Sequence, residues 1–406
     1  MSSPAVSRSR SWLSALLVVP VLAGLSGCGP SDAQAASKPV ESSSAGRSSG
    51  SSSPSSTPAG PAVTTNAAND LPARSALTVS TTAGRLTSVR VSGPYGNLEG
   101  SLNADGTRWT SSGERAPKVA YHLSATATNT AGGTTELDRT FTTGASPHTL
   151  TADVDPYGGQ TFGVGQPIVV TLSAPVNGKA ARAAVEKALV VSADKQFGPG
   201  SWYWWSGTQL HYRPKEFWPA HTKVHVDVNL EGVHAGEGLW GGTNRAVDFN
   251  IGRSFVMQIT NSSHQMTVTV DGQQVRTVPV SMGRSGFETR SGIKTVMSHE
   301  QSVRMTSASY GGKDFYDETV YLAQRLTWSG EYIHSAPWSV GSQGHANVSH
   351  GCVNVSPGNA QWLFDQTLVG DPVITTGTGR QMEPGNGTGG DWDISWAAWV
   401  AGSALS

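Results

Sequence analysis

Apolar and polar residues alternate along several short stretches of this chain. Residues 121–127 (Tyr-His-Leu-Ser-Ala-Thr-Ala) give the clearest example, and strand patterns recur at 167–172 and 224–228. Successive side chains of a β-strand point to opposite faces, so a period of two residues predicts a strand with one buried face. Turn signals such as Gly132-Gly133 separate these stretches. The pattern therefore predicts many short strands joined by turns.

A hairpin is predicted in the second half of the chain. Apolar residues alternate over 266–270, the Asp271-Gly272 pair follows, and apolar residues return over 275–280. Asp-Gly suits a tight turn between two antiparallel strands, because both central residues of that turn need a positive φ.

Three other segments favour helices. Ala180 to Leu189 is rich in alanine, the strongest helix former. Ser356-Pro357 has the pattern of an N-cap and a first helical residue, with Gly370 as the stop. The apolar and half-apolar positions between them follow helical spacing: Ala360, Leu363, Phe364 and Thr367. In the tail, the spacing of Trp392, Trp396 and Trp399 predicts one helical face that docks on the body.

These elements predict a mainly β protein of several domains. Residues 73–148 and 149–251 are each expected to form an immunoglobulin-like β-sandwich. Residues 252–377 form a third, β-rich domain with a short helix, and 378–406 a Trp-rich C-terminal subdomain. The 48 Gly, 22 Pro and 14 % charged residues among 406 fit short strands and turns. The net charge of −1 provides no field that would attract nucleic acid, so we expect no such partner.

The N-terminus has the pattern of an export signal. Arg8 and Arg10 precede an apolar run, 12–25, that is too short for a typical membrane span. It ends in Leu-Ser-Gly-Cys28, which resembles the lipobox of bacterial lipoproteins. That resemblance implies a signal peptide over 1–28, lipidation of Cys28, and a position on the outer face of the cytoplasmic membrane. The alternative is an ordinary secreted protein cleaved nearby.

Residues 29–72 are predicted to be a disordered tether. They consist mostly of Ser, Ala, Gly, Pro and Thr, with almost no large apolar residue up to about Asn69. Such a segment cannot bury enough surface to offset the entropy lost on ordering.

An aromatic cluster at 202–205, together with Trp218, has two interpretations. Aromatic faces can stack on sugar rings, which would make the second domain a carbohydrate-binding module. Bulky aromatics pack cores equally well, and we favour packing.

The strongest chemical signal surrounds Cys352. The chain has two cysteines, and Cys28 belongs to the export signal, so Cys352 has no disulfide partner within the mature chain. His350 and His334 lie upstream of it. A thiol next to an imidazole is a nucleophile for acyl transfer, because the imidazole can draw its proton near neutral pH.

Each group needed for acyl transfer has a candidate in this region. His334 is the candidate base, and the backbone carbonyl of Ser335 could hold its tautomer. Gly351 lets backbone N–H groups approach an oxyanion closely. Asn354 offers its amide to substrate, and His350 shapes the loop or binds substrate. The alternatives are an inert buried thiol, or a zinc site made of His334, His350 and Cys352.

At these residues the sequence resembles the L,D-transpeptidase (YkuD) family. Its signature is a histidine, a spacer, and then S/T-H-G-C, a hydrophobic residue and N or R. Here it reads His334, followed by Ser-His-Gly-Cys-Val-Asn at 349–354. The runs H-S-A-P-W-S-V and N-V-S-P-G-N-A-Q-W, and the order of the domains, resemble the actinobacterial lipoproteins of this family.

The resemblance implies a function and a set of site residues. Cys352 would attack a tetrapeptide stem of peptidoglycan at diaminopimelate, releasing D-alanine and leaving a thioester. The acyl group would then pass to the amine of a second stem and give a 3→3 cross-link. The backbone N–H groups of His350, Gly351 and Cys352 would line the oxyanion hole. Carbapenems are expected to inhibit the protein, and no cofactor is implied. The matching substrate-facing positions are Met305, Tyr310, Tyr316, Ser329, Gly330, Trp338 and Asn354.

Two departures from the family's pattern stand out. The family often has T-P-x-G where this chain has Thr289-Arg290-Ser291-Gly292, which we expect to loosen a turn. Some relatives have a calcium loop with Asp-x-x-Glu-Gly, where this chain reads His234-Ala-Gly-Glu-Gly. Calcium prefers oxygen ligands to imidazole, so no metal is predicted.

Three rival functions stay open at this stage. An L,D-carboxypeptidase would use the same thioester with water as the acceptor. A non-catalytic wall-binding lipoprotein would use its β-sandwiches alone. A secreted cysteine protease is disfavoured, because no protease signature surrounds Cys352.

Overall fold

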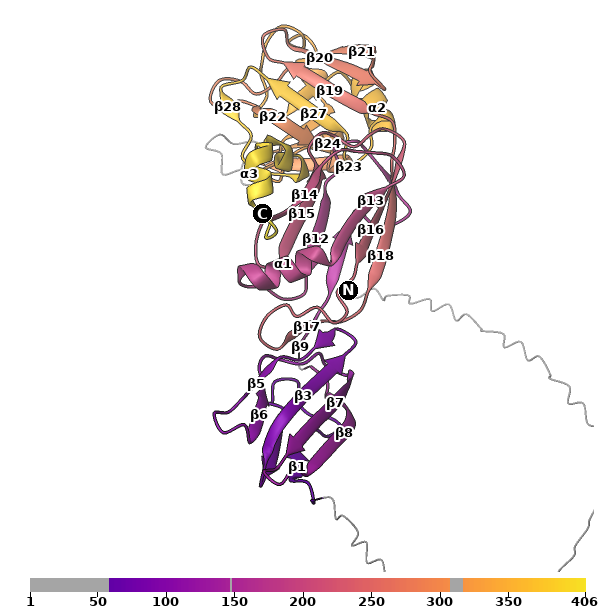
Figure 1. Ribbon diagram of the computed structural model, residues 1–406. Coiled ribbons are helices and arrows are strands. Elements are labelled where there is room, and N and C mark those ends of the chain that lie inside the picture. The colour runs from indigo at the N-terminus through magenta and orange to yellow at the C-terminus, as the bar shows by residue number, and fades with distance from the viewer. Residues whose placement is uncertain (1–57, 147, 307–316) are drawn as a thin grey trace, which may run out of the picture. The chain divides into compact units, whose positions relative to one another are not determined.

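The computed structural model describes residues 58–146, 148–306 and 317–406 (Figure 1). The predicted signal peptide with Cys28, most of the predicted tether, Tyr310 and Tyr316 lie outside these residues. The described part of the chain is mainly β, as predicted. None of its helices is both long enough and apolar enough to span a lipid bilayer.

Two four-stranded sheets make the first β-sandwich. The residues that alternate over 121–127 form part of β7, with Tyr121, Leu123, Ala125 and Ala127 buried against the opposite sheet. One sheet has the order β1 (Ala62–Thr65), β2 (Thr78–Thr82), β6 (Arg108–Ser111), β5 (Gly100–Leu102). The other has the order β4 (Gly96–Asn97), β3 (Arg85–Gly93), β7 (Ala120–Thr128), β8 (Thr134–Thr142).

The first strand begins earlier than the sequence suggested. Residues 62–65, which we assigned to the tether, form β1 and pair antiparallel with β2 over four positions. Val63, Thr64 and Thr65 are β-branched and fit a pleated edge, although the segment is too short and polar to show a periodic pattern.

The second domain is also a sandwich of two four-stranded sheets. Trp202, Trp204 and Trp218 are buried in its core, so the packing interpretation of the aromatic cluster is confirmed for them. Helix α1 (Lys179–Lys187) ends before Leu189, which instead begins a strand. The sheets have the orders β10 (Ala152–Asp155), β12 (Ile168–Leu172), β15 (Gln209–Pro214), β14 (Gly200–Trp204), and β11 (Thr161–Phe162), β18 (Arg245–Ile251), β16 (Thr222–Val228), β13 (Leu189–Ala193); β17 (Leu239–Gly241) pairs with β9 (His148–Leu150).

The third domain contains two sheets around a shared core. The predicted hairpin is confirmed: its strands pair antiparallel, and Asp271 and Gly272 have φ of 47° and 81°. The larger sheet has the order β21 (Gln273–Pro279), β20 (Gln265–Val270), β19 (Phe255–Thr260), β27 (Pro372–Thr376), β22 (Arg290–Thr295), β28 (Arg380–Gln381). The smaller has the order β23 (Ser298–Thr306), β24 (Asp317–Arg325), β25 (Tyr332–Ser335), β26 (Val353–Val355).

Helix α2 (Pro357–Gln366) follows strand β26 in the chain. Ser356 is its N-cap and accepts from the Asn359 N–H, as predicted. The helix ends at Gln366, earlier than Gly370, because Thr367 turns to an extended conformation while its hydroxyl donates to the Leu363 carbonyl. Leu363 and Ala360 pack into the core with Ile333, Val353 and Val355, so the helix supports the two short strands of the smaller sheet.

Arg213 is one of several residues that hold the tail against the second domain. The guanidinium carbon of Arg213 lies 4.9, 5.3 and 4.6 Å from the ring centroids of Trp392, Trp396 and Trp399. We had predicted that the three rings share one helical face, and this was wrong, because they belong to two helices. Trp392 belongs to the 3₁₀ helix η3 (Thr388–Asp393), and the other two belong to α3 (Trp396–Ala401).

Candidate active site

The parallel strands β25 and β26 place the candidate catalytic residues together. Ile333 pairs with Val353 and His334 pairs with Asn354 in their register. Ile333 and Val353 are both in the core, and side chains alternate across a sheet. His334 and Asn354 therefore point to the opposite face, and so does Cys352, which stands one residue before Val353.

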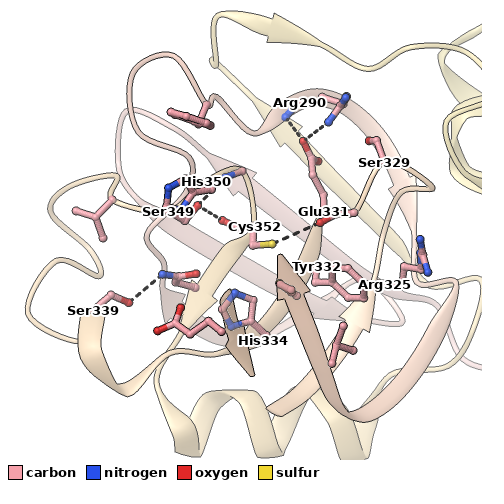
Figure 2. A pocket seen from close by; sticks show the side chains of 18 of the residues that line it. Arg290, Arg325, Ser329, Glu331, Tyr332, His334, Ser339, Ser349, His350 and Cys352 are labelled. Atoms are coloured by element: carbon pink, nitrogen blue, oxygen red, sulfur yellow. Dashed lines mark hydrogen bonds and ion pairs between the residues drawn. The ribbon is translucent and has the colours of Figure 1, made fainter. Parts of the chain in front are cut away.

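That face borders a pocket of about 880 Å³. Figure 2 shows the Cys352 sulfur and the His334 ring among the side chains that line it. Among the predicted site residues that the structure describes, only Ser335 does not line the pocket. Those that do are Met305, Ser329, Gly330, His334, Trp338, His350, Gly351, Cys352 and Asn354.

His334 is buried and held in one tautomer. Its Nδ1 lies 3.0 Å from the Ser335 carbonyl oxygen, which can only accept, so Nδ1 carries the proton and Nε2 has the free lone pair. Burial lowers the pKa of His334 to about 4, against which the hydrogen bond to Ser335 acts. The Trp338 ring, 53 % exposed at the pocket, lies 6.0 Å from the imidazole. At neutral pH the imidazole is therefore uncharged and able to accept a proton.

The Cys352 thiol is also neutral in the resting protein. Its S–H donates to the Gly330 carbonyl oxygen at 3.7 Å, and the residue packs against Met305 and Tyr332. Burial raises the pKa of this thiol to about 12; the Glu331 charge adds to the shift, and a backbone hydrogen bond from Tyr332 opposes it. This differs from the expectation that the imidazole draws the thiol to thiolate, because both groups are desolvated and their charged forms are disfavoured.

The loop before the sulfur is shaped by Gly351 and Ser349. Gly351 has φ of 126°, a conformation open to glycine and strained for other residues. Its N–H donates to the Ser349 hydroxyl oxygen at 3.0 Å, and that hydroxyl donates to the Cys352 carbonyl at 2.6 Å. The Gly351 carbonyl accepts from the Thr289 hydroxyl at 2.7 Å. The Gly351 N–H is thus used inside the loop at rest, and its role as an oxyanion donor stays a prediction.

His350 and Asn354 flank the sulfur from the same loop and strand. The His350 ring meets the Phe287 ring edge-on, with centroids 5.0 Å apart. Asn354 is buried; its amide nitrogen donates to the Ser339 hydroxyl at 3.1 Å, while its carbonyl oxygen has no partner within the described residues. That oxygen is a buried acceptor at the wall of the pocket, where a substrate N–H could reach it.

The positions expected to contact substrate differ in how far they are already engaged. Met305 is buried in the apolar cluster against which Cys352 packs. Ser329 is tied to Asn386, which accepts from its backbone N–H at 3.0 Å and donates to its hydroxyl at 2.8 Å. The Gly330 carbonyl accepts from the thiol. Gly330 therefore positions the sulfur in addition to facing the pocket.

The sequence did not predict a buried group of charged side chains beside the pocket. Glu331 accepts from the Arg290 backbone N–H at 3.0 Å and from its guanidinium at 2.9 Å, and Lys294 lies 3.2 Å from its other oxygen. Arg290 also pairs with Glu383. Arg290 thus opens strand β22 with both its backbone and its side chain engaged, so the expected loosened turn was wrong. Proline at this position would lack the N–H that Glu331 binds.

Only the spatial pairing reveals this group, because Arg290 and Glu331 are 41 residues apart in sequence. Arg325, Trp328 and Tyr332 also line the pocket. The sequence could have indicated these three residues only through their nearness to His334, because an arginine or an aromatic residue does not by itself indicate a site.

The residues compared with metal sites take part in other contacts in the described structure. The described part of the chain contains no group of three His, Cys, Asp or Glu side chains arranged to hold an ion. His234, in the segment compared with a calcium loop, lies with Nε2 3.4 Å from a Glu114 oxygen instead.

Comparison with known proteins identifies similar domains and similar full-length proteins. Residues 254–375 match the L,D-transpeptidase catalytic domain (YkuD), and residues 68–234 match a bacterial Ig domain. L,D-transpeptidase 2 of Mycobacterium tuberculosis is 34 % identical over 400 residues, covering 97 % of this chain and 96 % of that protein. L,D-transpeptidase 1 of the same organism is 40 % identical over 232 residues, covering 56 % of this chain and 84 % of that protein.

A solved structure of an L,D-transpeptidase in complex with imipenem is 36 % identical, with a TM-score of 0.49, and covers 56 % of this chain and 99 % of that one. The similarity to L,D-transpeptidase 2 spans nearly the full length of both proteins and includes the domain that carries Cys352 and His334. This chain is therefore a member of the L,D-transpeptidase family, in which a YkuD catalytic domain follows immunoglobulin-like domains in the sequence.

Proposed function

We propose that this enzyme forms 3→3 cross-links in peptidoglycan through a thioester on Cys352. The donor is a tetrapeptide stem, the scissile bond joins diaminopimelate to the terminal D-alanine, and the acceptor is the side-chain amine of a second stem's diaminopimelate. The observation that carries the proposal is the register of β25 and β26. It presents the sulfur and an imidazole of fixed tautomer on the same pocket face.

The first half-reaction acylates the enzyme. The sulfur attacks the carbonyl carbon of diaminopimelate as its proton passes to Nε2 of His334. Because thiol and imidazole are both neutral at rest, attack and proton transfer are coupled rather than preceded by an ion pair. The tetrahedral oxyanion collapses, the C–N bond breaks, and His334 returns the proton to the D-alanine amine, which leaves.

The second half-reaction restores the thiol. The acceptor amine attacks the thioester carbon and gives a proton to His334, the C–S bond breaks, and the sulfur takes that proton back. Water in place of the amine would yield a tripeptide and make the enzyme an L,D-carboxypeptidase. Exclusion of water by a bound acceptor stem favours the amine.

The supporting roles follow from the contacts at the site. The Ser335 carbonyl orients His334, and the backbone N–H groups of Cys352 and His350 stabilise the oxyanion. Gly351 shapes the loop that presents them. The donor stem contacts Met305, Ser329, Gly330, Trp338 and Asn354 in the pocket, while Tyr310 and Tyr316 are proposed on the resemblance alone.

The proposed location is the outer face of the cytoplasmic membrane. Leu-Ser-Gly-Cys28 after an apolar run supports lipidation at Cys28, and the segment that follows is rich enough in Ser, Ala and Gly to act as a tether. Radiolabelled palmitate should be incorporated into the parent protein and not into Cys28→Ala. Equal labelling of both would contradict the anchor.

Synthetic tetrapeptide stems test the proposed reaction. Incubation with the enzyme should release D-alanine and give a cross-linked dimer, detected by mass spectrometry. His334→Gln should give neither. Release of D-alanine with tripeptide as the only product would make the carboxypeptidase the correct function, and no release from any stem would refute both.

A further inference from the structure

The pocket has four arginines, and three of them are neutralised. Arg290 pairs with Glu331 and Glu383, Arg304 with Asp317 at 2.7 Å, and Arg380 with Glu383 at 3.0 Å. Arg325 differs from them. In the described part of the chain it has no carboxylate within ion-pair distance, although it lines the same pocket.

The Arg325 guanidinium is held rigidly. Its Nε donates to the Thr327 carbonyl and one terminal nitrogen donates to the Trp328 carbonyl, both at 3.1 Å. The cation lies 5.8 Å from the Trp328 ring centroid and 5.5 Å from that of Tyr332. A guanidinium has five N–H donors, so three stay available after these two bonds. They form a planar, pre-organised edge of the kind that binds carboxylates.

The nearby acids are directed elsewhere. Glu300, on the adjacent strand β23, accepts from the Ser298 hydroxyl at 2.9 Å. Glu318 lines the pocket at the opposite end of β24, seven residues from Arg325. The positive charge of Arg325 is therefore left for a ligand.

Tyr332 connects the Arg325 cation with the wall of the pocket that carries Cys352. Cys352 packs against the apolar cluster that contains Tyr332, and the Tyr332 ring packs with Arg325. Figure 2 shows Tyr332 flanked by Cys352 and Arg325. A group bound at Arg325 would lie in the same pocket as the carbonyl that the sulfur attacks.

We propose that Arg325 binds a carboxylate of the donor stem and selects stems that carry the free acid over stems with a carboxamide. This inference rests on the proposed function, because it takes a stem peptide as the substrate. Two carboxylates lie a few bonds from the scissile carbonyl: the C-terminal one of D-alanine, and the second carboxylate of diaminopimelate. A carboxamide is uncharged and forms a weaker hydrogen bond with a guanidinium.

Binding to an inactive protein tests the site apart from turnover. Full-length Cys352→Ala is titrated by calorimetry with a tetrapeptide stem and with two analogues, each carrying one of these carboxylates as the amide. One analogue should bind about tenfold more weakly than the acid, the loss expected for one charge-assisted hydrogen bond. In Cys352→Ala with Arg325→Gln, acid and amide should bind equally.

Two further variants control for folding and for charge. Arg325→Lys keeps the cation and should retain a preference for the acid, even if it changes the Thr327–Trp328 turn. Arg276→Gln removes an arginine that lies 4.5 Å from the Trp362 ring outside the pocket, and should leave the preference intact.

The outcomes separate the two proposals. Equal binding of the acid and both amides before Arg325 is changed, a preference that survives Arg325→Gln, or no binding of any stem would each overturn the Arg325 site. Acid-selective binding that depends on Arg325, with no D-alanine released by the parent enzyme, would support the site and refute the proposed reaction.

Discussion

Neutralising Glu331 should destabilise the catalytic domain severely. Its carboxylate is 4 % exposed and is the one acid among the described residues within ion-pair distance of Lys294, whose side chain is fully buried; Asp393 acts on Lys294 more weakly. The Glu331→Gln variant keeps the shape and leaves Lys294 charged without a carboxylate partner. The pKa of Lys294 is already lowered, chiefly by burial, and the Glu331 charge counteracts that effect.

The expected loss is about 3–5 kcal/mol in the free energy of unfolding, the range for removing one partner of a buried ion pair. For a domain of this size it corresponds to a fall of roughly 10–20 °C in melting temperature. Differential scanning calorimetry is the suitable assay, because the chain contains several domains and their transitions must be separated.

Two comparisons make this prediction specific. Glu383→Gln removes the other partner of Arg290, but Glu383 is 49 % exposed, so its loss should cost at most about 1 kcal/mol. Replacing the whole group (Arg290→Pro, Lys294→Met and Glu331→Val) removes all three charges together with the N–H that Glu331 binds. It should unfold within about 2 kcal/mol of the parent. A Glu331→Gln variant as stable as Glu383→Gln would refute the reasoning.

Three further predictions concern the site and its support. Because burial lowers the pKa of His334 to about 4, kcat/KM should stay level as pH falls through 6.5 and should decline only near pH 4. Because burial raises the pKa of the Cys352 thiol to about 12, the rate of its alkylation by iodoacetamide should keep rising about tenfold per pH unit up to about pH 10. A kcat/KM midpoint near 6.5, or an alkylation plateau near 8.5, would contradict these assignments. Gly351→Ala should lower the free energy of unfolding by about 1–3 kcal/mol, because alanine is strained at this positive φ, and should slow acylation. Gly358→Ala, at an exposed position of α2 with open space around it, should instead raise that free energy by about 0.5–1 kcal/mol. Equal shifts in melting temperature for the two variants would contradict the strain argument. Arg213→Ala should lower the free energy of unfolding by about 3 kcal/mol, because it removes three aromatic contacts and the hydrogen bonds to the Asp391 and Ile394 carbonyls. Arg182→Ala removes contact with one ring, Trp204, and one hydrogen bond, to the Val176 carbonyl, and should cost about 1 kcal/mol. Calorimetric melting of both variants checks the difference.

Local sequence patterns predicted the elements that are defined by their own residues. The alternation at 121–127, the Asp271-Gly272 turn and the Ser356 N-cap each depend on neighbours within a few positions, and each is confirmed. The predicted end of α1 was two residues too late, because an apolar residue such as Leu189 fits the end of a helix and the start of a strand equally well. Residues 62–65 were missed because pairing with β2, rather than any periodicity of their own, makes them a strand.

The candidate site divides in the same way. The grouping of His334, Cys352 and Asn354 on one face follows from a motif that the sequence displays directly. The ionisation states do not follow from it, because they depend on burial by residues distant in sequence, such as Met305 in the apolar cluster against which Cys352 packs. The Arg290–Glu331 pair, and the lack of a described carboxylate next to Arg325, depend on which strands meet, and single-residue chemistry cannot reveal that.

The most direct test of the account asks whether the Cys352 sulfur becomes acylated. A carbapenem contains a strained amide that a nucleophilic sulfur opens without losing a fragment. The intact mass of the protein should therefore rise by the full mass of the drug, and peptide mapping should place the adduct on Cys352. Cys352→Ala should keep its fold, because little packing is lost at a pocket wall, and should show no adduct. An adduct of the same yield on the alanine variant, or none on the parent, would contradict the account.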